Sequence, residues 1–418
     1  LNFVTLLMLG GSASLTAEPG EIARMVQTIN ARTGNPSTLT TAAADAFYEV
    51  FGAMGDALAS AAASSASHRV TRRQRLQRAS QYAAAQLFFV LATSRPDREE
   101  AIFNVCQQRF DAAASLYDPP AERFTVSSAF GEIPGYFFRP VDDHAARPTI
   151  IISNGSDGQN IDLTYAGLAA GLARGYNVVL FEGPGQMSPL FVRKVPFTPN
   201  WDEVVGPVYE WVKARPGVNK VGLIGISVGG MLCARAAANV QGLNAVVLEP
   251  AGYSYALTWG DQEDISTVRA AQSLPPNQKQ QVAAEFNAAA LQALSTLPPD
   301  EQFNVKKRGE IFVASVMLEA RAGALPGDYF GLLESMLAFE YANDFARISI
   351  PTMLTLNEGD QFFSSQAETA FALLGQVPPE DKILLPLTSA QGAQLHDQPT
   401  GPTVAQELIF DWLEKYLR

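Results

Sequence analysis

Eight short apolar runs, separated by helical stretches, restrict the fold of this chain more than any other feature. The runs are rich in β-branched and aromatic residues and occupy residues 124–128, 136–139, 149–153, 177–181, 220–224, 245–248, 352–356 and 382–386. Most of them are continuously apolar, which is typical of strands buried on both faces of a parallel sheet. Stretches with helical periodicity, such as 165–173 and 201–213, lie between them. The pattern predicts an α/β fold with a mostly parallel, doubly wound sheet.

Two long helical regions lie outside this alternation. Residues 1–119 are rich in Ala, Gln and Arg and predict an N-terminal helical domain, because alanine strongly favours helices. Residues 251–345 separate the sixth apolar run from the seventh, and they are too long and too periodic to be a simple connection. We therefore expect a helical lid at 251–345, inserted between two parts of the sheet domain at 120–250 and 346–418.

Composition excludes several classes of function. The chain has 30 Lys+Arg and 42 Asp+Glu, and its net charge of −12 would repel nucleic acids and anionic membranes. It has no apolar run of about 18 residues, so we expect no transmembrane helix. With 2 Cys and 3 His, a cysteine-rich metal site cannot form, and we expect no metal, no organic cofactor and a small-molecule substrate. The apolar start, residues 1–17, lacks the basic region of a secretory signal, so we expect it to fold.

The segment 225–230, Gly-Ile-Ser-Val-Gly-Gly, has the pattern of a nucleophile elbow centred on Ser227. This turn joins a strand to a helix and lifts the serine hydroxyl above the sheet, and larger neighbours would clash there. An apolar run precedes the segment and an Ala-rich helical stretch, 231–238, follows it. The alternative is a tight glycine-rich turn with a structural serine, but this context favours a nucleophile.

A serine nucleophile needs a base and an acid. Of the three histidines, His68 lies in the helical N-terminal region, His144 precedes a predicted strand, and His396 follows the last predicted strand. Loops at the carboxyl ends of parallel strands converge above the nucleophile, so His396 is the expected base. The loop after the strand at 352–356 offers two carboxylates. We expect Asp360 to orient the imidazole, with Glu358 as the alternative.

A second loop, 154–158, is expected to complete an oxyanion hole. The backbone N–H of Val228 would supply one donor, and the N–H groups of Ser156 and Asp157 would supply the second. A carboxylate here would repel an oxyanion, so Asp157 is either protonated or hydrogen-bonded to a substrate hydroxyl; the alternative is an Asp that caps the loop. The same loop contains a glycosylation-type triplet, Asn154-Gly155-Ser156, and a glycan would block the site, which favours a cytoplasmic location.

These residues resemble the α/β-hydrolase superfamily. The branch most similar contains the fermentation/respiration switch protein family, dihydroxypseudooxynicotine hydrolase and the fungal pigment-pathway hydrolases that shorten polyketides. The resemblance covers nearly the whole chain. Besides the elbow, it rests on the segments 20–22, 78–82, 133–137, 174–178, 181–186, 199–202 and 392–398.

The resemblance implies that Ser227, Asp360 and His396 match the family's catalytic triad, and that Asp157 matches an acidic position of its active site. It also implies a reaction: hydrolysis of a carbon–carbon bond in β-dicarbonyl or polyketide compounds by retro-Claisen cleavage. Ester, lactone or thioester hydrolysis, acyl transfer or a non-hydrolytic biosynthetic step are the alternatives, and a binding protein without turnover is an alternative of another class. This chain departs from the pattern at Met187, at Ser156 and at Asp397.

Aromatic residues are the candidates for substrate contacts. Tyr253 and Trp259 lie in the predicted lid, and Tyr82 lies in an N-terminal segment that carries the resemblance. Such side chains could stack on an aromatic substrate, although core packing is the more common role of aromatic residues. The helical N-terminal domain could also support a homodimer, but no residue requires one.

Overall fold

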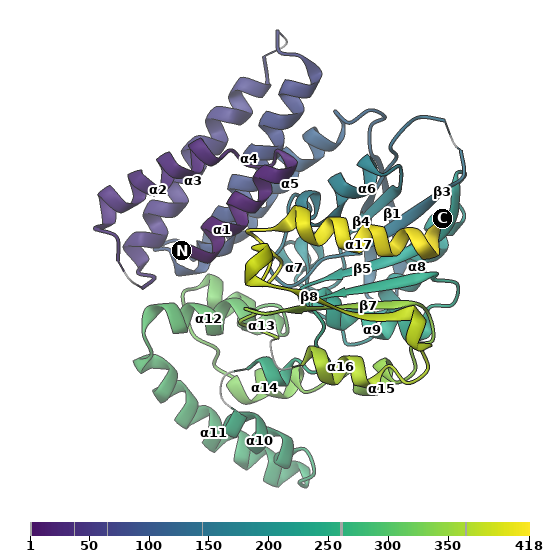
Figure 1. The fold of residues 1–418 in the computed structure, drawn as a ribbon. Helices are drawn as coiled ribbons and strands as arrows, with labels where there is room; N and C mark the ends of the chain where they lie inside the picture. The colour runs from purple at the N-terminus through teal and green to yellow at the C-terminus, as the bar shows by residue number, and fades with distance from the viewer. Residues whose placement is uncertain (1, 37, 65, 144, 260–261, 364–365) are drawn as a thin grey trace.

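An eight-stranded sheet forms the centre of the protein (Figure 1). The computed structural model describes residues 2–36, 38–64, 66–143, 145–259, 262–363 and 366–418. The strands lie in the order β1-β2-β4-β3-β5-β6-β7-β8. Strands β3 to β8 are parallel, and β2 is antiparallel to both of its neighbours, β1 and β4. Their bounds are β1 Glu122–Ser128, β2 Gly131–Phe138, β3 Arg147–Ser153, β4 Asn177–Phe181, β5 Val218–Ile226, β6 Ala245–Glu249, β7 Thr352–Asn357 and β8 Lys382–Leu387. The predicted α/β fold and its eight strands are confirmed.

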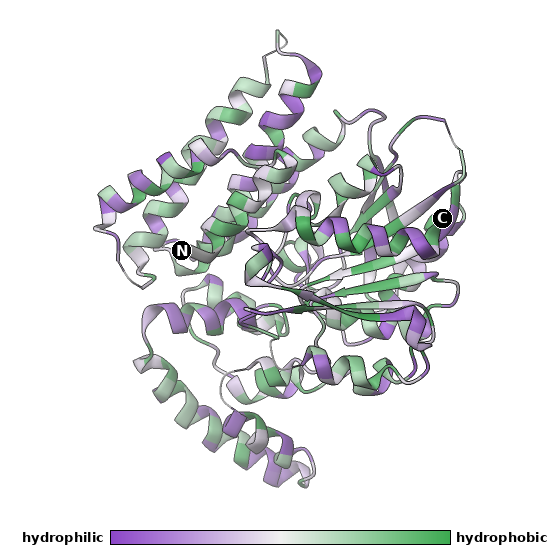
Figure 2. Ribbon diagram, in the orientation of Figure 1, coloured by the Kyte–Doolittle hydropathy of each residue, from purple (hydrophilic) through white to green (hydrophobic). Residues whose placement is uncertain are grey.

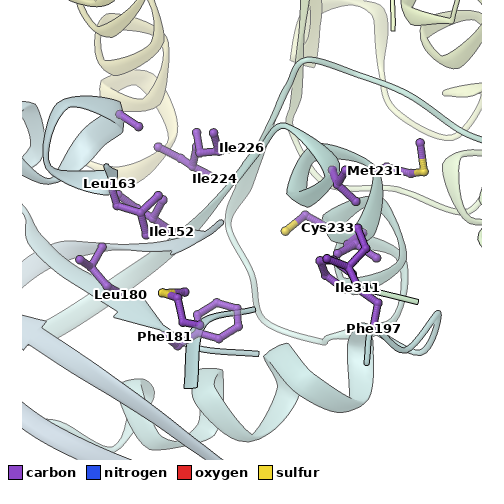
Figure 3. Close-up of a cluster of buried hydrophobic side chains, with 14 of the residues drawn as sticks. Ile152, Leu163, Leu180, Phe181, Phe197, Ile224, Ile226, Met231, Cys233 and Ile311 are labelled. Carbon is purple, nitrogen blue, oxygen red and sulfur yellow. The ribbon is translucent and has the colours of Figure 1, made fainter. Parts of the chain in front are cut away.

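Helices cover both faces of the sheet, which explains why the central strands are apolar throughout. One face carries α6 (Ala169–Ala173) and α17 (Pro402–Leu417), and the other carries α8 (Asp202–Lys213), α9 (Val228–Asn239) and α16 (Ala367–Leu373) (Figure 1). Every residue of β4 and β6 is buried. Figure 3 shows the resulting core, in which side chains of neighbouring strands cluster with those of α9; it labels Ile152, Leu163, Leu180, Phe181, Phe197, Ile224, Ile226, Met231, Cys233 and Ile311.

The helix predicted at 165–173 is divided in two. A π-helical turn at Thr164–Leu168 precedes α6, and Gly167 has φ 165°, outside the helical range. A Cβ on Gly167 would lie 2.8 Å from Cδ1 of Ile152, so the backbone packs closely on the end of a β3 side chain at the break.

The first 114 residues form helices that pack beside one end of the sheet (Figure 1). Their bounds are α1 Asn2–Gly10, α2 Pro19–Thr33, α3 Thr41–Ala62, α4 Arg69–Phe89 and α5 Glu99–Ala114. Local capping defines two of the starts: the Thr40 hydroxyl accepts the N–H of Ala43, and Nδ1 of His68 accepts the N–H of Val70. Stacked and edge-on rings, including Phe47 and Phe51, fill the space between them.

The chain between β6 and β7 is a helical lid. Its helices are α10 Gln262–Ala271, α11 Pro276–Thr296, α12 Pro299–Gly309, α13 Ala314–Arg321, α14 Tyr329–Met336 and α15 Ala342–Phe345. Figure 2 shows hydrophobic residues along the central strands and more hydrophilic residues on the outlying helices α10 and α11. The lid is joined to the N-terminal helices by a buried ion pair, in which Arg321 Nε lies 2.8 Å from Glu99 Oε2. Across the described residues, no helix has both the length and the apolar character that a membrane span needs.

Candidate active site

Ser227 occupies the turn between β5 and α9 in a conformation that few residues adopt. Its φ of 55° and ψ of −127° are strained for a residue with a side chain. The glycines around it are required by close backbone contacts: a Cβ on Gly225 would lie 2.3 Å from the carbonyl oxygen of Gly229, and one on Gly229 would lie 2.5 Å from that of Asn154. The chain therefore holds Ser227 in the geometry that the elbow pattern predicts.

Two side chains from distant loops continue a hydrogen-bonded path from Ser227. The Oγ of Ser227 lies 2.8 Å from Nε2 of His396, and Nδ1 of His396 lies 2.9 Å from Oδ2 of Asp360. The other oxygen of Asp360 accepts the N–H groups of Phe362 and Phe363, at 2.7 and 2.8 Å. These two bonds fix the carboxylate, so that it presents its free oxygen to the imidazole.

The charges of this path are set by its burial and its partners. Burial acts to lower the pKa of His396, but the carboxylates of Asp397 and Asp360 outweigh it and the pKa is raised. Burial likewise opposes the ionisation of Asp360, but the hydrogen bonds from His396 and from two backbone N–H groups lower its pKa. Each of the two groups thus stabilises the charged form of the other, the ion pair that exists when the imidazole carries a second proton.

The other candidates for acid and base lie elsewhere. Glu358 is exposed and accepts the N–H and the hydroxyl of Ser389, at 2.6 and 2.8 Å, and these bonds lower its pKa. The structure thus brings Asp360, and not Glu358, to the imidazole. His68 caps a helix of the N-terminal region, and His144 lies outside the described residues.

The loop at 154–158 lies directly against Ser227. A Cβ on Gly155 would be 2.6 Å from Cβ of Ser227, so only glycine fits there. The N–H of Gly155 donates to Oδ1 of Asn154 at 2.8 Å, and Nε2 of Gln186 donates to the carbonyl oxygens of Asn154 and Gly155, at 2.5 and 3.1 Å. On the opposite side Val228 begins α9, where a backbone N–H has no acceptor within the helix. The sequence did not predict that Gln186 braces this loop, although the segment 181–186 carries part of the resemblance.

Asp157 is paired with an arginine from the lid. The Nη1 of Arg308, in α12, lies 2.7 Å from Oδ2 of Asp157, and the hydroxyl of Ser156 donates to the same oxygen at 3.1 Å. The guanidinium also lies 4.9 Å from the ring centroid of Phe362. The other oxygen of Asp157 is buried and has no hydrogen-bond partner among the described residues. Arg308 was missed because its segment, Lys306 to Arg308, reads as the charged end of a surface helix.

Ser227 and His396 open into a cavity of about 1020 Å³ that lies between the lid and the N-terminal helices. A smaller pocket of about 80 Å³ shares Ser227, His396 and Arg308 with it and adds Asp157 and Asp397. The larger cavity is of the size that holds ligands of several rings. Its apolar and aromatic wall includes Val4, Phe88, Phe89, Tyr255, Trp259, Leu294, Phe303, Tyr329 and Phe362.

Of the three aromatic residues predicted to contact the substrate, the structure places one, Trp259, at the cavity. Trp259 lines the cavity, and its Nε1 donates to the Tyr329 hydroxyl at 2.9 Å. Tyr253 does not line either of the two cavities at the nucleophile. Tyr82 is also absent from them, because its ring is buried inside the N-terminal helices and its hydroxyl donates to Glu21 at 2.7 Å. No group of three His, Cys, Asp or Glu side chains suited to a metal ion occurs in the part of the chain that the structure describes.

Comparison by sequence finds relatives that match part of the chain, and comparison by structure finds proteins that superpose on nearly all of it. No protein-family model matches. Hydrolase LUC6 of Fusarium sp is 30% identical over 180 residues, 41% of this chain and 43% of the relative. The 20-hydroxy-prefusarin hydrolase FUS2 of Gibberella moniliformis is 29% identical over 170 residues, 38% of this chain and 41% of the relative. The chain thus spans less than half the length of the curated relatives it matches.

Solved structures match over a longer range. The crystal structure of 2,6-dihydroxy-pseudo-oxynicotine hydrolase superposes with a TM-score of 0.65 at 17% identity, over 98% of this chain and 95% of that one. The structure of AbyA5 superposes with a TM-score of 0.55 at 14% identity, over 91% of this chain and 95% of that one. At these identities the matches establish a shared fold.

Proposed function

We propose that this chain, which belongs to the α/β-hydrolase superfamily, is a serine hydrolase that cleaves a carbon–carbon bond of a β-dicarbonyl or polyketide-type small molecule. The observation that carries the proposal is the hydrogen-bonded path from Ser227 through His396 to Asp360, which opens into a large cavity. In this arrangement the histidine takes the proton of the serine, and the acid holds the imidazole tautomer and stabilises the imidazolium. The hydrolase names of its fungal relatives support the same class of reaction.

The proposed reaction begins when Oγ of Ser227 attacks a ketone carbonyl and its proton moves to Nε2 of His396. The developing oxyanion would be held by the N–H of Val228 and by those of Ser156 and Asp157. The N–H of Gly155 is not counted, because it already donates to Asn154. Cleavage of the carbon–carbon bond leaves an acyl-enzyme and a carbanion, and water then releases the acyl group with His396 as the base.

The sequence suggested that Asp157 could bond to a substrate hydroxyl, but not that Arg308 pairs with it. A carboxylate alone beside the oxyanion hole would repel the intermediate, but Arg308 at 2.7 Å balances its charge. The unpartnered oxygen of Asp157 remains able to accept a hydrogen bond from a substrate hydroxyl. We propose that the pair orients a polar part of the substrate, while the aromatic wall of the cavity holds the apolar part.

The test compares two substrates with the same acyl group, an aryl β-diketone and an aryl ester, by product analysis. We expect the wild type to cleave the diketone faster than the ester, and Ser227→Ala to abolish cleavage of both. Ser266→Ala, a change at an exposed serine of the lid, serves as the matched control and should leave the rates unchanged.

Other outcomes would select the other hypotheses. Turnover of the ester alone would favour an esterase, lactonase, thioesterase or acyl transferase that uses the same triad. Labelling of Ser227 by a fluorophosphonate without turnover of either substrate would favour a non-hydrolytic step. Absence of labelling in the folded protein would overturn a nucleophilic serine and favour a binding protein.

A further inference from the structure

His396 has a carboxyl group on each side of its ring. Asp360 lies at Nδ1, and Oδ1 of Asp397 lies 3.5 Å from Nε2, the nitrogen that also faces Ser227. Asp397 lines the smaller pocket together with Ser227. Its side chain is 18% exposed, and its Oδ1 is buried without a hydrogen-bond partner in the part of the chain that is described. A carboxyl oxygen of this kind is available to a proton or to a ligand in the pocket.

The backbone holds Asp397 in this place at a cost. Asp397 has a φ of 57° and the next residue, Gln398, has a φ of 45°, so two successive residues are left-handed. Aspartate and asparagine tolerate this region better than most side chains. The turn directs the Asp397 carboxyl back to the ring of the preceding residue, and strained conformations of this kind are found at functional sites.

The surroundings of Asp397 raise its pKa above the usual value of an aspartate. Burial raises its pKa to about 6, although the neighbouring His396 acts in the opposite direction. Charged and titratable groups face it from several elements: Asp360 after β7, Asp157 and Asp162 after β3, Tyr165 in the π-helical turn, Glu249 at the end of β6, and Arg308 in α12. A carboxyl that gains and loses a proton near neutral pH is suited to general acid catalysis.

We infer that Asp397 is a further catalytic residue, the acid that protonates the carbanion released by carbon–carbon cleavage. The inference rests on the proposed function. Asp157 is less suited to this role because Arg308 already holds it. Ester hydrolysis with an aryloxide leaving group needs no such acid, whereas a carbanion must receive a proton on carbon.

Each proton that moves during cleavage has a donor and an acceptor in the site. The proton of Ser227 moves to His396 as the bond from Oγ to the carbonyl carbon forms. When the carbon–carbon bond breaks, its electron pair remains on the leaving carbon, which takes the proton of the Asp397 carboxyl. The imidazolium then returns a proton to Asp397 across the 3.5 Å gap. His396 is neutral again and can activate the water that releases the acyl group.

The test is Asp397→Asn, which keeps the shape and the left-handed backbone but cannot donate a carboxyl proton. We expect this change to slow cleavage of the aryl β-diketone at least tenfold more than that of the matched aryl ester. Glu358→Gln is the control, because it alters an exposed carboxyl that bonds to Ser389 and does not face His396, and it should change neither rate. If the wild type cleaves the diketone and Asp397→Asn leaves the ratio of the two rates unchanged, the inference about Asp397 is wrong, but the proposed reaction stands. If the wild type does not cleave the diketone, the proposed reaction itself is wrong.

A second measurement needs no substrate. The rate at which a fluorophosphonate labels Ser227 depends on neutral His396, so its pH profile reports the pKa of the imidazole. The ionised form of Asp397 raises the pKa of His396, and Asp397→Asn removes this form, so the acid limb of the profile should move to lower pH by about one unit. An unchanged profile in a variant with the melting temperature of the wild type would show that Asp397 does not act on His396.

Discussion

Replacing Asp360 with asparagine tests the proposed triad at the residue whose two carboxylate oxygens both have assigned partners. In the wild type, Oδ1 accepts two backbone N–H groups, from Phe362 and Phe363, and Oδ2 faces Nδ1 of His396. The asparagine oxygen must take the place of Oδ1, so its NH₂ group faces the imidazole. The imidazole then carries its proton on Nε2 and cannot accept the proton of Ser227. Asp360→Asn should therefore fold but lose the base.

The magnitude follows from the same contacts. Turning the amide over would restore the correct tautomer but would leave two backbone N–H groups facing an NH₂ group, at about 1–3 kcal/mol each. The sum of about 2–6 kcal/mol corresponds to a rate loss of roughly 30-fold to 10⁴-fold. Loss of the carboxylate charge beside the imidazolium adds to this, so we expect a decrease of about 10³-fold or more.

The assay is the second-order rate of fluorophosphonate labelling at Ser227, with turnover of the aryl ester as a second readout. Glu358→Gln is the matched control, since it changes the other carboxylate of the same loop, which is exposed and bonded to Ser389. A variant at Asp360 that keeps more than a tenth of the rate would refute the reasoning. A comparable loss in Glu358→Gln would also refute it, and would make Glu358 the acid.

Three further predictions concern the surroundings of the nucleophile. Arg308→Met should lower the free energy of unfolding by about 3 kcal/mol in urea denaturation, because it leaves Asp157 as an unpaired carboxylate. Asp157→Asn, added to the same chain, should recover most of this loss. A double variant without recovery would contradict the pairing. Gly155→Ala should slow fluorophosphonate labelling of Ser227 about 100-fold, because the new methyl group would lie 2.6 Å from Cβ of Ser227. Gly206→Ala is the control and should be labelled at the wild-type rate, because a Cβ there meets nothing within 4 Å. Burial raises the pKa of Glu249 to about 8, so the folded state binds its proton more tightly than the unfolded state, and stability should fall as pH rises from about 4.5 to 8. Glu249→Gln should therefore raise the urea midpoint at pH 9 relative to wild type and change it little at pH 4. Equal midpoints at pH 9 would contradict this.

The strands could be predicted because each is a local pattern. A run such as 245–248 is apolar at every position, and only a strand covered on both faces requires this. The elbow at Ser227 could be predicted for a similar reason, because the clash that demands Gly225 arises within one strand–turn–helix unit. The clash that demands Gly229 is with the carbonyl oxygen of Asn154, and only the structure shows it. The break at Gly167 could not, since the residue that packs closely on it, Ile152, belongs to another element of the fold.

The choice between neighbouring candidates needed the structure. Asp360 and Glu358 stand two residues apart and are chemically alike, and only the hydrogen bonds of Asp360 to His396 and of Glu358 to Ser389 separate them. The aromatic residues were predicted less well. Trp259 lines the cavity, whereas Tyr82 is turned into the packing between the N-terminal helices, and a sequence does not state which way a ring points.

By itself the sequence determined the sheet, the strained serine turn and the order of serine, acid and histidine, because these depend on short-range sterics and on the order of strands along the chain. The tertiary structure decided what surrounds them: the charge of Asp157 balanced by Arg308, and a wall formed by Phe88 of a distant helix. These contacts join residues more than a hundred positions apart. Their partners are selected by how whole layers pack, and no local pattern in the chain records that selection.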